Sequence, residues 1–443
     1  MVTSPEFLVI IMFAGLVIGL SFGFPVPFVM LGISLIVGVL AGEGVGFFSM
    51  MVLRMFETMQ NYILASIILF IYMGIMLERS GMGDKLFSSC HVLLGRLPGG
   101  LALAVLAVCT IMAASTGIMG APVMIMGMVA LPVLLKKGYD PRMSCGIVCA
   151  GGTLGILIPP SIMLVVYGPM AGLSVGKLFM GAFLPGLTLS VLYAVYIFVR
   201  CTINPELGPP LSLEERNLPF VKKASMALTS MGPPLLLIFS VLGTMFFGIA
   251  APTEAAALGA FASLILTLLY RKLDWKAFKE SAYATLRASS MILLIVAAAY
   301  IFTGTFMKVG GGELVQNFLL NLSVGRWGVM AIMCFSFFIC GFFMEWPGIL
   351  PILVPIFTPI LKKLGFDPIW AAMAFCVCMQ TSFLTPPMAP ALFYLKGVAP
   401  KEVSFVSHIC AGVVPFIVIQ IIGLGLVLAF PQLTLWLPSV MIK

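Results

Sequence analysis

The sequence predicts an all-α polytopic membrane protein made of two inverted-topology repeats, each with five crossings and one re-entrant helical hairpin. Three observations predict this fold class. Hydrophobic residues fill 61% of the 443 positions and charged residues only 9%, too few to cover a soluble fold. Landmark residues recur at one fixed offset between the halves, and each half holds an odd number of apolar runs.

The two halves share their landmarks at a spacing of 227 residues. Gly138-Tyr139-Asp140-Pro141 recurs as Gly365-Phe366-Asp367-Pro368. The same offset relates Pro25 to Pro252, Pro132 to Pro359, Pro159-Pro160 to Pro386-Pro387, and Tyr167 to Tyr394. Matches spread over most of each half indicate a duplicated unit, which in a membrane protein is typical of secondary transporters.

Apolar runs of crossing length define the elements in order. In the first half they are near 6–23, 26–42, 61–78, 143–170 and 178–200, and in the second near 226–248, 254–270, 288–307, 368–394 and 405–430. Stretches 99–135 and 327–361 are interrupted by small residues, Gly and Pro, and are predicted to be hairpins that return on the same side. We therefore expect a first repeat over 1–203, a polar linker over 204–225 and a second repeat over 226–443.

Loop charges predict the orientation, because five crossings per repeat require the second copy to enter from the opposite side. With the N-terminus outside, 17 of the 24 basic residues fall in inner loops and 7 in outer ones. This bias favours both termini outside, with hairpin 99–135 opening inward and hairpin 327–361 outward. The same placement accounts for the net charge of +8, so no nucleic-acid partner is expected.

Several segments have a plainer interpretation. No Lys or Arg precedes Arg54, so the first apolar run lacks the basic start of a cleaved signal and is expected to remain as a helix. Segments 43–59 and 273–287 are polar enough to lie along the membrane surface as amphipathic arms, with plain loops as the alternative. The ten cysteines lie in apolar runs and are expected to be small buried hydrophobes.

The strongest local signal is a break inside the crossing 143–170. Three glycines, Gly151, Gly152 and Gly155, precede Pro159-Pro160, and two successive prolines with glycines nearby should unwind the helix and free several carbonyl groups. Such backbone is tolerated at membrane depth only where it faces protein or a wet cavity. Freed carbonyls with a Thr or Ser hydroxyl suit a hard monovalent cation, and the half-helix starting at Ser161 offers its N-terminus to an anion.

The second half repeats the break with hydroxyl residues, Gln380-Thr381-Ser382-Phe383-Leu384-Thr385-Pro386-Pro387. Each break should be completed by its hairpin tip, 114–117 in the first half and 341–345 in the second. Glu345 in this apolar hairpin either holds a cation or proton or reaches water at the tip. Glu254, which opens a helix after Pro252, is more simply a first-turn charge on the helix dipole. No catalytic triad, metal cluster or nucleotide motif predicts an enzyme.

At these residues the chain resembles the large membrane subunit of tripartite ATP-independent periplasmic (TRAP) transporters. The resemblance runs nearly end to end, through Leu97-Pro98-Gly99-Gly100, Gly138-Tyr139-Asp140-Pro141, Ile158-Pro159-Pro160-Ser161, Pro185-Gly186-Leu187, Pro252-Thr253-Glu254-Ala255 and Thr385-Pro386-Pro387. It implies a sodium-driven elevator-type transporter of the bacterial inner membrane, with Na⁺ as coupling ion and no other cofactor. It also implies a small four-helix membrane (Q) subunit and a periplasmic substrate-binding (P) protein that delivers a small organic acid.

The resemblance further implies sodium sites where hairpin tips meet broken helices. The implied ligands are Ser115, Thr116, Gly152, Thr153 and Pro159 in one half, and Gly341, Thr381, Ser382 and Thr385 in the other. Ser161, Glu345 and Gln380 are the predicted substrate contacts. The chain departs from the family where Cys378 replaces a frequent Asn and where Ser382 and Ala389 replace Gly, so the second ion site is expected to differ in its ligands.

Residues 380–400 resemble the family branch named for mannitol and chloroaromatic compounds, whose relatives include 2-oxo acid carriers, so a monocarboxylate is the first expectation. Proton coupling remains an alternative to sodium. A channel is a further alternative, although inverted hairpins on opposite faces suit alternating access better than an open pore. A membrane-embedded enzyme is disfavoured, because it predicts paired acids or metal ligands at helix depth.

Overall fold

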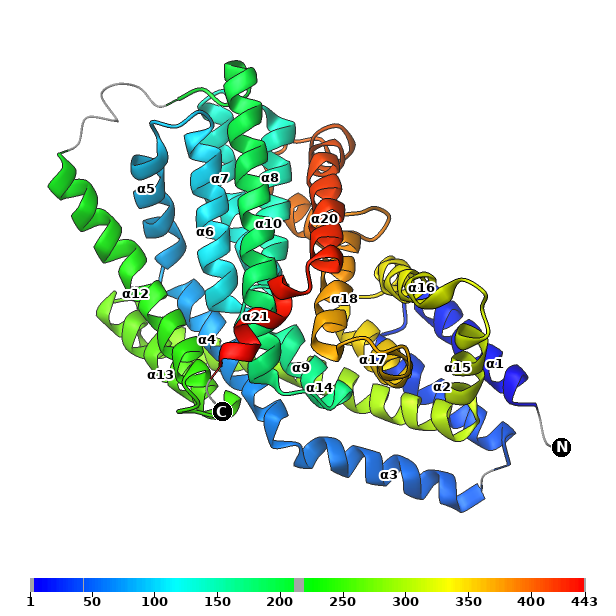
Figure 1. Ribbon diagram of the computed structural model, residues 1–443. Coiled ribbons are helices and arrows are strands. Elements are labelled where there is room, and N and C mark those ends of the chain that lie inside the picture. The colour runs from blue at the N-terminus through cyan, green and yellow to red at the C-terminus, as the bar shows by residue number, and fades with distance from the viewer. Residues whose placement is uncertain (1–3, 43, 211–218, 442–443) are drawn as a thin grey trace.

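The computed structural model describes residues 4–42, 44–210 and 219–441, and within these ranges the regular structure is helical throughout (Figure 1). The predicted linker 204–225 begins with the short turn Pro205–Leu207, and its middle, 211–218, lies outside the described residues. Helices of the two halves are intermingled in space, so that elements far apart in the chain pack side by side.

The helices of the first half correspond to its predicted crossings. The unbroken ones are α1 (Pro5–Ser21), α2 (Val26–Leu40), α4 (Ala65–Arg79) and α10 (Val175–Ile203). The fourth crossing is divided into α8 (Pro141–Thr153) and α9 (Ile162–Ala171). The hairpin consists of α6 (Gly100–Thr116) and α7 (Gly120–Lys136).

The second half repeats this order. Its unbroken crossings are α12 (Phe220–Phe246), α13 (Pro252–Leu269), α14 (Trp275–Lys308) and α20 (Ala411–Ala429), the last preceded by the π-helical turn Phe405–Cys410. The broken crossing is α18 (Pro368–Ser382) followed by α19 (Pro390–Val398), and the hairpin is α16 (Gly325–Cys340) and α17 (Trp346–Lys363). Each hairpin also packs on the opposite half, because α7 contacts α19 and α17 contacts α9.

The two predicted surface arms have different outcomes. α3 (Gly44–Gln60) is a separate helix that runs along the lower edge of the molecule (Figure 1). Asn61 follows it and starts the short turn Tyr62–Leu64, where its Oδ1 accepts from the Ile63 amide. From Trp275 on, the segment 273–287 is the start of the 34-residue helix α14, so the plain-loop alternative is wrong there, and its position along the membrane surface stays a prediction. Residues 275–303 contain neither Pro nor Gly, so nothing stops the helix between the arm and the crossing.

Three helices were not anticipated. α5 (Met82–Leu94) and α15 (Gly311–Leu320) join a crossing to a hairpin in the first and second half, and α21 (Gln432–Val440) packs on α10 near the C-terminus. Their apolar segments are too short to cross a membrane, so apolar runs of crossing length do not predict them.

The repeated Gly-x-Asp-Pro motif joins each hairpin to its broken helix. Gly138 and Gly365 have φ of +79° and +73° and follow the ends of α7 and α17, a conformation that glycine adopts without steric cost. Asp140 Oδ2 then accepts from the Met143 amide at 2.8 Å, and Asp367 Oδ1 from the Ile369 amide at 2.8 Å. Pro141 and Pro368 occupy the first helical position, where no amide hydrogen is needed.

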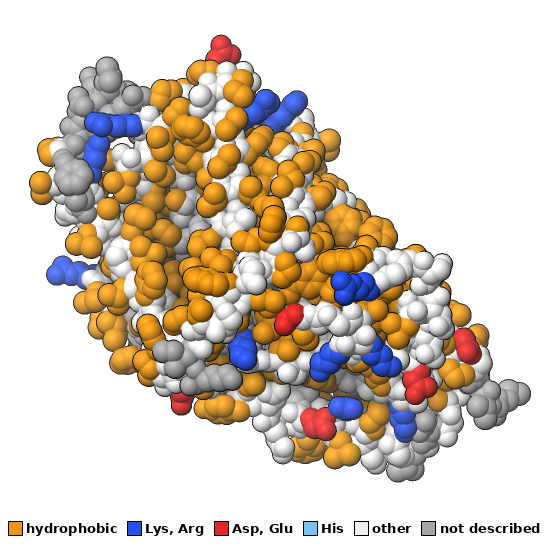
Figure 2. Space-filling view, viewed as in Figure 1, with side chains coloured by type: hydrophobic (Ala, Val, Ile, Leu, Met, Phe, Trp, Pro, Cys, Tyr) orange, Lys and Arg blue, Asp and Glu red, His pale blue; other side chains and the backbone are white. Residues whose placement is uncertain are grey.

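The outer surface matches a membrane environment. Hydrophobic side chains cover most of the upper and middle part of the face in Figure 2, and charged side chains gather at its upper edge and lower third. Within the described ranges, six helices are long and apolar enough to cross a membrane by length and composition. Eight of the ten cysteines are buried, and all ten are free, in agreement with their interpretation as small hydrophobes.

Candidate functional site

The first break replaces regular helix by a tight turn and an extended proline segment. α8 ends at Thr153, a 3₁₀ turn covers Leu154–Ile156, and α9 starts at Ile162 after Pro159-Pro160. All residues from 151 to 163 are buried. The backbone groups released here therefore face protein, as the membrane interior requires.

The tip of the first hairpin lies directly on this break. The Ile162 amide donates a hydrogen bond to the Gly117 carbonyl oxygen at 3.4 Å. A Cβ atom at Gly117 would lie 2.6 Å from the Pro160 oxygen, and one at Gly155 would lie 2.5 Å from the Ile118 oxygen. Backbone approaches backbone here, and only glycine permits that distance.

The second break has a related construction with a side-chain contact. α18 ends at Ser382, and α19 starts after Ala389, whose φ of +36° is left-handed. A Cβ atom at Gly341 in the second tip would overlap Ser382 Oγ, so the tip touches the end of α18. The Pro159–Pro160 and Pro386–Pro387 peptide bonds are both cis.

The hydroxyl groups among the predicted ion ligands share one hydrogen-bonding pattern: each donates its proton to a carbonyl oxygen three or four residues earlier. Ser115 and Thr116 donate to Met112, Thr153 to Ala150, Thr381 to Val377, Ser382 to Met379 and Thr385 to Thr381. The oxygen lone pairs remain available as acceptors. Together with carbonyl oxygens they form the neutral, oxygen-rich surroundings that a hard cation prefers.

The three predicted substrate contacts lie in different surroundings. Ser161 caps α9 by position, but its hydroxyl donates back to the Ile156 oxygen. Gln380 is fully buried and donates through Nε2 to Thr153 Oγ1 at 3.2 Å. Glu345 lies at the second tip, exposed by surface area, and its Oε1 accepts from the Tyr394 hydroxyl at 3.1 Å. The structure thus joins Gln380 to Thr153 at the first break and places Glu345 beside Tyr394 of α19.

Tyr394 was not among the predicted site residues. Its ring lies 3.6 Å from where a Cβ of Gly120 would be, so it stands between the first hairpin and Glu345 of the second. The sequence held a signal for it, because Tyr394 matches Tyr167 at the repeat offset. Glu254 has the structural role expected of it, since its Oε2 accepts from the Ala251 amide at 2.8 Å at the start of α13.

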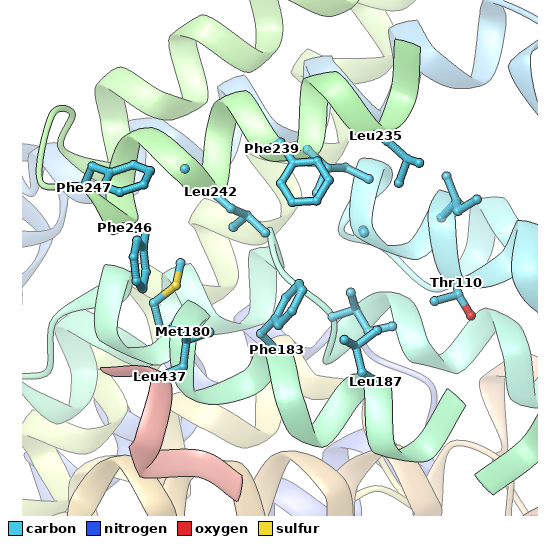
Figure 3. Close-up of a pocket in the computed structure, with 15 residues that line it drawn as sticks. Thr110, Met180, Phe183, Leu187, Leu235, Phe239, Leu242, Phe246, Phe247 and Leu437 are labelled. Atoms are coloured by element: carbon cyan, nitrogen blue, oxygen red, sulfur yellow. The ribbon is translucent and has the colours of Figure 1, made fainter. Parts of the chain in front are cut away.

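A cavity of about 420 Å³ lies between α12 and the helices α6 and α10 (Figure 3), and it borders the first break at Ile158 and the first hairpin tip at Ala114. Phe239, Leu242 and Phe246 of α12 face Phe183 and Leu187 of α10 across it, and among the described residues that line it Thr110 has the one polar side chain. Such a lining gives an organic anion no partner. A second apolar cavity, of about 410 Å³, borders Thr381 and Thr385 at the second break.

Two broken crossings, each closed by a hairpin from its own half of the chain, define a secondary transporter of the elevator-type helical fold. Residues 9–433 match the family model described as "Tripartite ATP-independent periplasmic transporter, DctM component", and the chain belongs to this family. It is a transporter for solute uptake rather than an enzyme, a multi-pass inner-membrane subunit that works with a small membrane subunit and a periplasmic binding protein.

Individual relatives agree with this assignment. The chain is 31% identical to the C4-dicarboxylate TRAP transporter large permease protein DctM of Pseudomonas aeruginosa, over 87% of this chain and 88% of that protein. It is 26% identical to the sialic acid permease SiaM of Vibrio cholerae, over 95% of this chain and 96% of that protein. The YdaH transporter of Alcanivorax borkumensis shares the fold, with a TM-score of 0.65, 14% identity, and coverage of 96% and 98%.

The substrate names of these relatives do not support the mannitol and chloroaromatic branch expected from residues 380–400. They are C4-dicarboxylates, sialic acid, ectoine in Halomonas elongata and isethionate in Oleidesulfovibrio alaskensis. A local resemblance of some twenty residues is a weak guide to substrate, because binding contacts are spread over several helices.

Proposed function

We propose that this permease imports a small organic acid anion in symport with sodium by an elevator motion, after a periplasmic binding protein has delivered the substrate. The observation that carries the proposal is the matched construction of the two breaks, where buried hydroxyl oxygens and released carbonyls lie under a hairpin tip. The proposed sodium ligands are Ser115, Thr116, Gly152, Thr153 and Pro159 at the first break, and Gly341, Thr381, Ser382 and Thr385 at the second.

The chemistry of these ligands supports a monovalent cation. Hydroxyl protons at both breaks are donated to carbonyls of the same helix, so the oxygens present lone pairs outward. None of the proposed ligands is a carboxylate, and a neutral set suits a single positive charge better than a divalent ion. Sodium bound between tip and break would hold the hairpin closed.

The start of α9 supports an anionic substrate. The first amide groups of a helix point toward its N-terminus and favour negative charge there. We place the substrate near Ser161, Glu345 and Gln380, and we retain a monocarboxylate or 2-oxo acid as the first candidate. The neighbouring carboxylate of Glu345 favours a substrate with few negative charges.

The movement follows from how the hairpins pack. α7 contacts α19 and α17 contacts α9, so the hairpins and broken helices form one connected body that can shift as a unit. An ion or substrate drives the shift only by binding one state more tightly than the other. In this proposal both termini face the periplasm, the first hairpin opens inward and the second opens outward.

Sodium binding can be tested without knowing the substrate. The thermal unfolding midpoint of the purified full chain is measured in NaCl and KCl at equal ionic strength. A ligand that binds the folded state at a hundredfold excess over its Kd stabilises it by about 2.7 kcal/mol. We expect a sodium-specific rise that Ser115→Ala and Thr385→Ala each reduce.

Thr202→Ala is the matched control. Thr202 makes the same backward hydrogen bond, to the Phe198 oxygen, but it is exposed near the end of α10 and remote from either break. Its sodium response should equal that of the parent. An equal midpoint in the two salts for the parent would refute sodium coupling and direct attention to protons, with Glu345→Gln as the next variant.

Transport itself is tested in proteoliposomes that contain the membrane complex, with the binding protein outside and either a sodium or a proton gradient imposed. The substrate panel contains monocarboxylates, 2-oxo acids, C4-dicarboxylates, ectoine and sialic acid. Uptake driven by sodium alone supports the proposal, and uptake driven by protons alone contradicts it.

A further inference from the structure

Four fully buried polar side chains meet at the centre of the helix bundle. Thr153 on α8, Gln380 on α18, Tyr193 on α10 and Gln420 on α20 each have 0% exposed surface. α20 packs on α8, α10 and α18, which brings the four helices together. We call these four residues the axial cluster.

The cluster consists of two pairs of repeat-related residues. Gln380 follows Thr153 by 227 positions, and Gln420 follows Tyr193 by the same 227. Two residues related by a two-fold axis lie at equal distances from the axis. Repeat-related residues that touch each other must therefore lie next to the axis. Gln380 and Thr153 touch through their hydrogen bond, which places the pseudo-two-fold axis of the repeats between them.

The packing of α10 against α20 places the second pair, Tyr193 and Gln420, beside the Gln380–Thr153 contact. The Tyr193 ring meets the Phe416 ring edge-on at a centroid distance of 5.3 Å, one turn before Gln420. A Cβ atom at Gly423 would overlap Leu189, so the two helices approach closely around the cluster. The Tyr193 hydroxyl lies near the side chains of Gln420 and Thr153 without a hydrogen bond to either.

Four atoms of the cluster are buried and lack a hydrogen-bond partner: Gln380 Oε1, Tyr193 Oη, and both Oε1 and Nε2 of Gln420. A buried polar atom that stays unpaired destabilises the folded protein, because it has lost its hydrogen bonds to water. The set contains donors as well as acceptors, so small rotations of the amide and hydroxyl groups can pair its members with one another. A cation bound here would leave the Gln420 amide hydrogens unpaired, because a cation accepts no hydrogen bond. The mixture of donors and acceptors therefore suits hydrogen bonds among the four side chains better than a third ion site.

We propose that the axial cluster couples the two ion sites to each other, with Tyr193 and Gln420 as positioning residues for the Gln380–Thr153 bond. The inference rests on the proposed sodium coupling. Thr153 Oγ1 gives its proton to Ala150 and one lone pair to Gln380, which leaves one lone pair for an ion at the first break.

An ion on that remaining lone pair withdraws electron density from Thr153 Oγ1 and weakens the bond that Gln380 donates to it. Gln380 then pairs instead with the unpaired groups of Gln420 and Tyr193. Because Gln380 directly precedes Thr381 and Ser382, its position sets the end of α18, where the second ion binds. Occupation of one break thereby alters the affinity of the other.

The test is the equilibrium binding of radioactive sodium to the folded full chain at one temperature, as a function of sodium concentration, in the parent and in Tyr193→Phe and Gln420→Met. Both variants remove polar atoms and keep the packing, since Tyr193→Phe deletes one oxygen only. We expect the Hill coefficient to lie above 1 in the parent and to fall to about 1 in either variant. Tyr283→Phe, on the 63% exposed Tyr283, should keep the parental value.

The outcomes separate this inference from the function on which it rests. A parental Hill coefficient retained in both variants would overturn the coupling and leave sodium binding intact. A parent that binds no sodium would overturn both. If a single variant fails to fold, the double variant Tyr193→Phe/Gln420→Met serves instead, because replacing both members of a polar pair by apolar groups is often nearly neutral for stability.

Discussion

The backbone amide of Ile162 donates a hydrogen bond to the carbonyl oxygen of Gly117, so the tip of the first hairpin closes the first turn of α9. This bond occupies one of the amide groups at the start of α9 that have no partner within the helix. It also ties the position of the hairpin to the geometry of the break. A substitution at the hairpin tip should therefore change the geometry of the proposed ion site.

Gly117→Ala should loosen this contact. Gly117 has a φ of +65°, and an added Cβ would lie 2.6 Å from the Pro160 oxygen. The left-handed conformation alone costs a non-glycine residue about 1–2 kcal/mol, and the collision adds to that cost. We expect a lower unfolding midpoint together with a reduced sodium response.

Gly325→Ala separates the backbone strain of a left-handed residue from the collision of its Cβ atom. Gly325 has a φ of +68° but nothing lies within 4 Å of its added Cβ, so this variant carries the backbone strain without a collision. It should lower the midpoint less than Gly117→Ala and leave the sodium response unchanged. Equal behaviour of the two variants would show that tip contact with Pro160 is unimportant.

Ala389→Gly should stabilise the protein. Ala389 has a φ of +36° at the start of α19, and glycine adopts such a conformation without a clash of Cβ. Relief of this strain lowers the free energy of the folded state by about 1 kcal/mol. Glycine also gives the unfolded chain more conformational freedom, which offsets part of this gain. Thermal unfolding measures the change. Ala399→Gly, where φ is −66°, is the control and should destabilise slightly; a similar loss in both would contradict the strain at Ala389.

Glu254→Ala should weaken the start of α13. The Glu254 carboxylate accepts from the Ala251 amide and lies in the first turn of the helix, where negative charge is favoured. The side chain is exposed, so the loss should lie between about 0.3 and 1 kcal/mol. Glu254→Gln keeps an acceptor without the charge, and its midpoint should fall between those of the parent and Glu254→Ala. An unchanged sodium response in both variants would agree with a structural role.

Glu345→Gln should tighten binding of an anionic substrate. The variant removes a negative charge from the second hairpin tip while leaving an oxygen that can accept from Tyr394. Reduced repulsion should lower the KM for uptake by a few-fold at unchanged sodium dependence. A clearly higher KM would instead place Glu345 on a positively charged group of the substrate. Tyr394→Phe, which removes only the hydrogen bond, measures how much of the effect comes from orientation of the carboxylate.

Much of the fold was predictable because its signals are local. Crossings follow from apolar runs, and the ends of the hairpins follow from Gly138-Tyr139-Asp140-Pro141 and its repeat, where glycine ends one helix and aspartate starts the next. The continuous helix α14 was missed for the converse reason. A polar segment looks like a surface arm in sequence, and it continues as helix because no residue stops it before the apolar part begins.

The sequence alone determined that this chain lies in a membrane, that it is duplicated, and where each crossing breaks, because composition, repeat offset and proline position are properties of single segments. Only the tertiary structure decided which polar groups meet. Tyr193 and Gln420 lie in separate, largely apolar helices, and the sequence of either helix by itself does not predict which polar group the residue meets. Their neighbours are set by the two-fold packing of the repeats, which brings residues 227 positions apart to one point.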